Sequence, residues 1–346
     1  MTPMGAIAER RRPLVEVPGV EPPGRGPEGG GPPYKVTVVI PCFNYGRFVG
    51  EAVRSAVGQE NADVRVVVVD DGSTDGRTPR MCDRAAMQGR AGQVRVIHQA
   101  NAGLPAARNR GAAGATGEFL VFLDADDFLE PDFVAKLAPA ARGQGVSHAY
   151  CQPRMVGPAE ELVWRVPAWD EELLLVTNLH PVTGVVRREC FEAVGGFSED
   201  MREGYEDWDL WLKLAGRGWR GERVAEPLFV YRRHSESTMI VRAVARHEEL
   251  YRRIVGRHTG LFARHGDSVI ARMNDMLRRE DMNWLDESGV PIRLLALERQ
   301  RDLYEGMTAV RAHRMVHGMV SALPRPLARG ARAALGAVKR ALNAGR

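Results

Sequence analysis

The sequence is poor in cysteine and lacks a long apolar run. Its four cysteines are scattered over 346 residues, so neither a CxxC zinc site nor a disulfide framework is indicated. No run approaches the ~18 apolar residues that a membrane span needs. The basic triplet Arg10 to Arg12 is followed by Pro13 rather than by an apolar signal core. We therefore expect a protein of the reducing cytoplasm that is not secreted.

The net charge is also small, because 48 basic residues stand against 44 acidic ones and leave +4. That balance does not indicate a nucleic-acid-binding protein. Acidic residues are missing altogether after Glu305, where arginine and lysine accumulate. Between Pro324 and Arg346, small apolar residues share one arc at helical spacing and basic residues lie opposite. This pattern predicts either a helix on an anionic membrane surface or a basic tail that is solvated or docked on the main domain.

The chain divides into three regions by composition. Residues 1–33 are dense in proline and glycine and predict a disordered arm. Residues 34–240 carry the strand and helix pattern of a folded domain. Residues 241–346 lose the strand signal and become helical and basic, which predicts a helical C-terminal extension.

In the middle region, apolar β-branched runs alternate with helical patterns. This alternation predicts an α/β domain of parallel strands with crossover helices. The runs expected to form strands are 35–40, 64–69, 94–97 and 118–123, and the helices are expected over 48–59, 79–88 and 105–113.

Polar side chains follow three of these predicted strands, and ligands of open α/β sheets bind outside such strand ends. Repulsion within the acidic cluster should raise the pKa of at least one carboxyl. Alone, the cluster could equally be a solvated strand-to-helix loop, with Pro131 in the first helical turn. The residues concerned are Pro41, Phe43 and Asn44 after the first strand, Asp70 and Asp71 after the second, and Asp124, Asp126 and Asp127 after the fourth.

Four stretches between about Tyr34 and Met239 together resemble a family 2 glycosyltransferase. They are "VVIPCFNYGRFVGEAVRSAVGQ", "VVVVDDGSTDG", "NAGLPAARNRGAAGATGEFLVFLDADD" and "EGYEDWDLWLKL". The resemblance implies a GT-A fold, which is a Rossmann-like mixed sheet flanked by helices. It also implies an inverting transfer from a nucleotide-sugar donor, which we expect to be UDP-linked.

By this resemblance, the first two strand ends hold the donor nucleotide. Asp71 or its neighbour Asp70 would accept a hydrogen bond from the base, with Pro41, Phe43 and Asn44 walling the pocket. The four residues Asp70, Asp71, Gly72 and Ser73 after the second strand also suit a turn and helix cap. Arg108, with Asn109, would contact the diphosphate or steady the acidic loop, or simply lie on a surface helix face.

The stretch "DADD" corresponds to the DxD motif of the family. Asp124 would face the ribose, and Asp126 would bind a divalent metal, Mn²⁺ or Mg²⁺, with His234 reaching the metal or the diphosphate. Such ions keep several waters, so one or two protein carboxylates suffice. The acidic motif of haloacid-dehalogenase phosphatases is a competitor, although that motif favours Thr or Val where Phe128 stands.

The stretch "YEDWDLW" supplies the expected base. Asp207 would begin a helix and take the proton of an acceptor hydroxyl, while Glu206 would orient it or touch the acceptor. Asp207 could instead only cap the helix. His180 faces the acceptor or is structural, and a structural role is the commoner one for a lone histidine.

The sequence therefore predicts a metal-dependent inverting glycosyltransferase with a glycan, lipid-linked or other hydroxyl acceptor, active in cell-surface polysaccharide or glycoconjugate synthesis. It would act in the cytoplasm, with a peripheral position on the inner face of the membrane if the tail binds lipid. The alternatives are a non-catalytic nucleotide-sugar-binding protein of the same fold and the phosphatase. No nucleic acid is expected as a partner.

Membrane attachment through the tail can be tested by deletion. Removing Pro324 to Arg346 should leave the catalytic domain folded but weaken binding to anionic vesicles, because the basic residues of the tail are lost. Added salt should weaken binding of the intact protein, since it screens the same charges. Equal vesicle binding by both forms in a sedimentation assay would count decisively against the membrane role.

Overall fold

The computed structural model describes residues 33–157, 162–233 and 246–278, and its centre is a seven-stranded mixed sheet in the order β10-β6-β9-β4-β1-β2-β3. Strand β9 runs antiparallel to its neighbours β4 and β6, and the other pairs of this sheet are parallel. The strands are β1 (Tyr34–Cys42), β2 (Ala62–Asp71), β3 (Val94–Gln99), β4 (Phe119–Phe122), β6 (Val146–Tyr150), β9 (Gly184–Arg187) and β10 (Arg220–Arg223).

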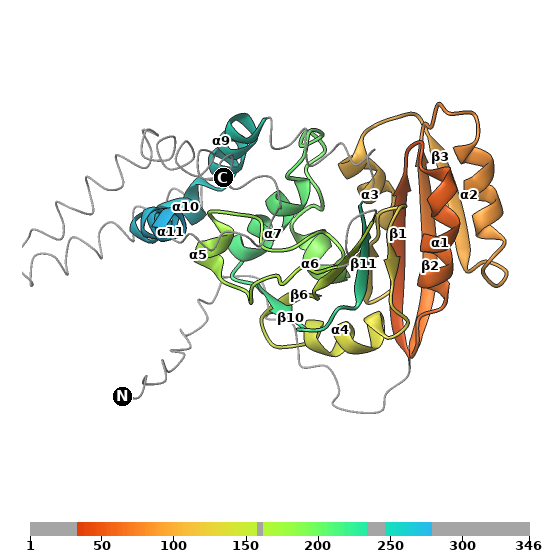
Figure 1. Cartoon of the computed structure of the whole chain (residues 1–346), viewed down its shortest axis with the longest axis horizontal. Helices are drawn as coiled ribbons and strands as arrows, with labels where there is room; N and C mark the ends of the chain where they lie inside the picture. Colours follow the sequence, from red (N-terminus) through yellow and green to blue (C-terminus); the bar gives the residue numbers. More distant parts are fainter. Residues whose placement is uncertain (1–32, 158–161, 234–245, 279–346) are drawn as a thin grey trace, which may run out of the picture.

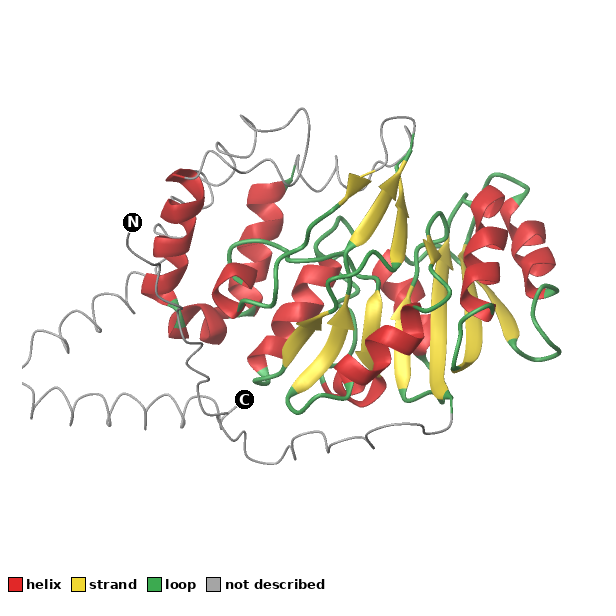
Figure 2. Cartoon of the chain, turned by 60° about the horizontal axis from the view of Figure 1, so that its bottom comes forward, coloured by secondary structure: helices red, strands yellow, loops and turns green. Residues whose placement is uncertain are grey.

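A second, four-stranded sheet has the order β5-β11-β7-β8. It stands beyond one end of the main sheet (Figure 2). Its strands are β5 (Phe128–Leu129), β7 (Pro153–Val156), β8 (Leu162–Val163) and β11 (Phe229–Arg232). Because β5 directly follows the acidic cluster and pairs with β11, this sheet fixes the loop in which the acidic residues lie.

Helices cover both faces of the main sheet (Figure 1). Val38 and Ile40 of β1 belong to one hydrophobic cluster and Val39 to the other, as expected for a strand buried on both faces. The first cluster includes residues of α1 (Gly46–Val57), α2 (Thr78–Ala86) and α4 (Phe133–Ala141). The second includes residues of α3 (Leu104–Ala112), α5 (Glu171–Leu174), α6 (Arg188–Ala193) and α7 (Glu206–Gly216).

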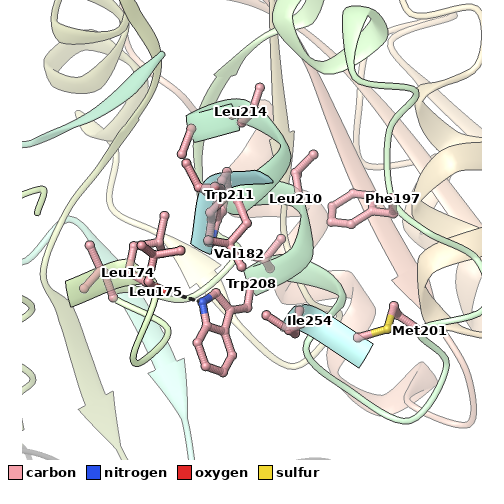
Figure 3. Packing of buried hydrophobic residues seen from close by; sticks show 14 of the residues in the cluster. Leu174, Leu175, Val182, Phe197, Met201, Trp208, Leu210, Trp211, Leu214 and Ile254 are labelled. Atoms are coloured by element: carbon pink, nitrogen blue, oxygen red, sulfur yellow. Dashed lines mark hydrogen bonds between the residues drawn. The ribbon is translucent and has the colours of Figure 1, made fainter. Parts of the chain in front are cut away.

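The C-terminal helices share the second cluster with α7. They are α9 (His247–Arg257), α10 (Thr259–Arg264) and α11 (Gly266–Arg278). Tyr251 and Ile254 of α9 lie in the same cluster as Trp208 and Trp211 of α7 (Figure 3 shows Ile254 beside α7). The described part of this extension, residues 246–278, contains these three helices and packs on the α/β domain. In the described parts of the chain, no helix has the length and apolar character of a membrane span.

The predicted alternation of strands and helices is confirmed, with shifts at the ends of elements. Strands β1 and β2 continue through Cys42 and Asp71, so Pro41 lies inside β1 opposite Val69. A proline is tolerated there because the β4 ladder ends at Val39, which leaves β1 a neighbour on one side only. Helix α4 begins after Pro131, which therefore lies outside its first turn.

A close contact between α3 and β1 makes a stability prediction. A Cβ added at Gly111 would lie 2.3 Å from Cγ1 of Val39 and 3.2 Å from Cγ2 of Val69. Gly111→Ala should therefore lower the free energy of unfolding by about 1–3 kcal/mol through overpacking. Gly256→Ala in α9 is the matched control, since no atom lies within 4 Å of its added Cβ, and it should be neutral or stabilising by about 0.5–1 kcal/mol. Equal denaturant midpoints for the two variants would contradict the packing argument.

Candidate active site

The loops after β1 and β2 are bonded to each other. Asn44 has a left-handed backbone, with φ of 60°. Its Oδ1 accepts a hydrogen bond from the Thr74 N–H (2.8 Å), and its own N–H donates to Oγ of Ser73 (3.0 Å). Beside it, the Phe43 side chain is 42% exposed. The structure thus brings these two predicted nucleotide residues to the same edge of the sheet. Pro41 is buried at the end of β1, and its expected place in the pocket wall stays a prediction.

Asp71 connects the ends of β2 and β3. It is buried, and its Oδ1 accepts hydrogen bonds from Nε2 of Gln99 and the N–H of Ala102, both at 2.8 Å. Its Oδ2 accepts from the N–H of Gly103 at 2.9 Å. The carboxylate therefore organises the loop that leads into α3, and its predicted contact with a nucleobase stays a prediction.

Asp70 is also held by hydrogen bonds, to the turn after β2 and to a side chain of β3. Its Oδ1 accepts a hydrogen bond from the Ser73 N–H (3.1 Å), and its Oδ2 lies 2.8 Å from Nδ1 of His98. The hydrogen bond to Asp70 raises the pKa of His98, because the carboxylate favours the charged imidazole. The carboxylate of Asp70 is thus held by the "DDGS" turn and by β3.

Arg108 joins the predicted donor site to the predicted base. This side chain is 1% exposed in α3. Its Nη2 donates to Oδ1 of Asp124 at 2.7 Å, and its Nη1 donates to Oε1 of Glu206 at 2.6 Å. Burial alone would lower the pKa of the guanidinium, but Asp124 and Glu206 together hold that pKa above its ordinary value. One buried cation therefore links the end of β4 to the start of α7.

The three aspartates after β4 have different surroundings. Asp127 is buried, and its Oδ1 accepts a hydrogen bond from the Arg232 N–H at 2.8 Å. Burial, Asp126 and Asp124 raise the pKa of Asp127 well above its usual range, which confirms that the cluster raises the pKa of one member. Asp124 and Asp126 remain partly exposed. Asp127 thus anchors the loop to β11 and leaves the other two carboxylates at the surface.

The two partly exposed carboxylates, of Asp124 and Asp126, fit a divalent cation of the Mg²⁺ or Mn²⁺ type. Such ions take one or two protein carboxylates and complete their coordination with water and substrate phosphates. In the described ranges, no three potential ligand side chains gather into a closed site. The predicted ligand His234 lies outside the described residues.

Asp207 lies in the first turn of α7, as predicted. Its Oδ1 accepts from the Trp208 N–H (2.7 Å) and its Oδ2 from Nδ2 of Asn178 (2.9 Å). Burial and the neighbouring Glu206 raise the pKa of Asp207 to about 7, against the opposing effect of Arg108. A carboxyl with a pKa near neutrality suits a general base.

Other predicted residues have structural contacts. Asn109 donates to the Phe197 carbonyl (2.9 Å) and accepts from the N–H of the same residue, so it ties α3 to the segment before α7. His180 is buried and 3.1 Å from His148, which decides for the structural role over an acceptor contact.

Sequence reasoning missed Gln99, Asn178 and Arg232. Gln99 ends β3, so the same rule that selected the other strand ends would have found it. Arg232 ends β11, and its Nε donates to the Asp126 carbonyl (2.8 Å) while Nη2 donates to Oε2 of Glu51. Asn178 lies in a segment without any recognisable motif, and only the folded chain brings it to Asp207.

The chain is similar to known proteins in sequence and in fold. Among curated proteins, the chain is similar to the chondroitin synthase of Pasteurella multocida, at 28% identity over 187 residues, which is 53% of this chain and 19% of that protein. The chain spans less than two thirds of the length of the first curated relatives that it matches.

Two solved structures share the fold. TarS residues 1–349 of S. aureus in complex with UDP-GlcNAc aligns with a TM-score of 0.51 at 19% identity, over 81% of this chain and 92% of that one. The mannosyltransferase PcManGT of Pyrobaculum calidifontis, in complex with GDP-Man and Mn²⁺, aligns with a TM-score of 0.50 at 20% identity, over 96% and 84%. The mixed sheet with helices on both faces is thus the GT-A fold of glycosyltransferases.

The sequence match then specifies the family. Residues 37–200 match the model of Glycosyl transferase family 2. The protein carries a family 2 glycosyltransferase domain, and this domain contains the predicted donor-binding strand ends and the DADD motif. The match decides against the haloacid-dehalogenase alternative.

The link through Arg108 predicts a strong effect on stability. Arg108→Met removes the one cation that Asp124 and Glu206 share, and breaking a buried pair typically costs about 3–5 kcal/mol. Denaturant unfolding of the parent and the variant at pH 8 measures the loss.

Arg110→Met is the matched control, because Arg110 is exposed two residues further along α3. Its free energy of unfolding should lie within about 0.5 kcal/mol of the parental value. Parental stability of Arg108→Met at pH 8 would show that the buried pair contributes nothing.

Proposed function

We propose that the protein is a metal-dependent inverting glycosyltransferase. It would move a sugar from a nucleotide-sugar donor, which we expect to be UDP-linked, to a hydroxyl group of a glycan or lipid-linked acceptor in polysaccharide or glycoconjugate synthesis. The observation that carries the proposal is the pair of bonds from Arg108 to Asp124 and Glu206, at 2.7 and 2.6 Å. These bonds join the DADD motif to the helix turn that holds Asp207.

The donor would lie across the ends of β1, β2 and β4. Phe43 and Asn44 would border the nucleoside, Asp70 and Asp71 would keep the base-binding loops in place or contact the base, and Asp124 would face the ribose. Asp126 and His234 would hold the divalent cation, which supplies charge stabilisation for the leaving diphosphate. Arg108 would support this site because its Nη2 donates a hydrogen bond to the Asp124 carboxylate.

Asp207 would act on the acceptor. Its carboxylate takes the proton of the acceptor hydroxyl as that oxygen bonds to the anomeric carbon of the sugar, and the nucleotide diphosphate leaves from the opposite face. Glu206 is ion-paired with Arg108 and would orient Asp207 or touch the acceptor. The non-catalytic binding protein remains the alternative from another class, and transfer assays distinguish the two.

Dependence on the cation follows from the position of Asp126. Asp126→Asn should weaken Mn²⁺-dependent donor binding and cut turnover heavily, because it removes a charged oxygen ligand. Calorimetric titration of the donor with and without Mn²⁺ measures the first effect. Full activity of the parent enzyme in excess chelator would sink the metal proposal.

The role of Asp207 can be tested by a nearly isosteric change. Asp207→Asn should fold and bind the donor like the parent, but it cannot take up a proton at neutral pH. Loss of a general base typically lowers the rate by ~10²–10⁴, so kcat should fall at least by the lower bound with little change in donor affinity.

The pH profile gives a second readout for the same variant. Since the base works only when deprotonated, the parental rate should fall as the pH drops below about 7, the raised pKa of Asp207. This acidic limb should vanish from the residual activity of Asp207→Asn. Near-parental transfer by the variant would mean that the base lies elsewhere.

A further inference from the structure

The carboxylate of Asp207 is held from two directions. The Trp208 N–H that bonds Oδ1 belongs to α7 itself, whereas the amide that bonds Oδ2 belongs to Asn178, 29 residues earlier in the chain. The backbone bond alone leaves the carboxyl group free to turn about its side-chain torsions. Asn178 therefore supplies the contact that fixes the plane of the carboxylate relative to the rest of the site.

Asn178 keeps this contact although its other amide atom is unsatisfied. Its Oδ1 is buried and has no hydrogen-bond partner among the described residues. A buried acceptor without a partner is unfavourable and calls for an explanation. Turning the amide over would place that oxygen against the Asp207 carboxylate, which repels it when ionised. The observed orientation is thus the one that an ionised Asp207 selects.

The segment that carries Asn178 is anchored on its N-terminal side. The Leu174 carbonyl accepts a hydrogen bond from Nε1 of Trp208 at 2.6 Å, drawn as a dashed line in Figure 3. The next carbonyl, of Leu175, accepts from the Tyr251 hydroxyl at 3.1 Å. Both donors are buried side chains, so the segment is fixed to α7 and α9 just before Asn178.

On its C-terminal side, the same segment is anchored by two buried histidines. Nε2 of His180 lies 3.1 Å from Nε2 of His148, and Nδ1 of His180 lies 3.0 Å from the Pro181 carbonyl. Burial lowers the pKa of both rings, so both are neutral. One proton arrangement satisfies these contacts: His180 donates to Pro181 and accepts from His148, whose Nδ1 accepts from the Ser147 hydroxyl at 3.0 Å.

Among the described residues, the charged and titratable groups around Asp207 include Glu206, Arg108 and Tyr205. Glu206 disfavours a second negative charge, and the cation of Arg108 is shared between Glu206 and Asp124. A neutral N–H donor that points at Oδ2 favours the ionised carboxylate without adding charge. Asn178 is the described side chain that does this.

Building on the proposed function, we propose that Asn178 is a positioning residue that orients Asp207 and favours its ionised form, and that the buried His148–His180 contact fixes the segment carrying Asn178. The proposal assigns no contact between Asn178 and substrate.

The first test follows the titration of Asp207 and needs no acceptor. In the full-length protein labelled with ¹³C in aspartate, Asp207→Asn identifies the Asp207 signal. Asn178→Leu should raise the pKa of Asp207 by about one unit, because a donor to the charged form is lost. Thr177→Val, on the neighbouring half-buried residue, should leave that pKa unchanged. An unshifted titration in folded Asn178→Leu overturns the proposal.

The second test uses transfer kinetics and a double-mutant cycle. Asn178→Leu should lower kcat about fivefold at pH 7, recover towards the parental rate at high pH, and leave the donor KM unchanged. In the Asp207→Asn background, Asn178→Leu should cause no further loss of kcat. Equal losses at every pH, or additive losses in the double variant, would mark a merely structural role and overturn the inference.

Two controls keep the outcomes separate. Should Asn178→Leu fail to fold, Asn178→Ser removes the amide at smaller volume and is subject to the same titration. If Asp207→Asn retains parental transfer, the base assignment of the proposed function fails, whereas the ¹³C titration still decides whether Asn178 acts on Asp207.

Discussion

The arrangement of the site depends on one buried guanidinium. Arg108 is 1% exposed and its Nη atoms bond Asp124 and Glu206. A cation in such a place is tolerated only when carboxylates neutralise it. The end of β4 and the first turn of α7 must therefore stay together for the protein to fold. Because these two elements hold the proposed donor and base residues, the same requirement that stabilises the fold also assembles the site.

The charges of the site then follow from how this cation is shared. Asp124 and Glu206 divide it between them, so Asp207 receives only part of its effect and keeps a pKa raised to about 7 by burial and by Glu206. Asp127, whose Oδ1 accepts a hydrogen bond from the Arg232 N–H of β11, also has its pKa raised, chiefly by burial. Clustered carboxylates thus take separate roles because each has a different neighbour. Asp127 anchors its loop, whereas the proposed roles in cation binding and proton transfer fall on Asp126 and Asp207, which have other neighbours.

Local pattern predicted the first four strands of the main sheet and their crossover helices. The runs around Val38 and Val66 are β-branched and buried on both faces, and polar residues at their ends marked the site edge. Pattern failed where the answer lay in tertiary contacts. Arg108 looked equally like a surface helix residue, and the acidic partners that bury it lie 16 and 98 residues away. Asn178 and His180 carry no signal of their own, since their roles exist only through Asp207 and His148.

The most direct test of the account is a crystal structure of the full chain with Mn²⁺ and a nucleoside diphosphate. The account predicts the diphosphate at the end of β4 with Asp126 at the metal, while Arg108 still bonds Asp124 and Glu206. Asp207 should face the open side of the β-phosphate, where the sugar would be. A nucleotide bound away from the DADD loop, or an Arg108 side chain released from both carboxylates in the complex, would contradict it.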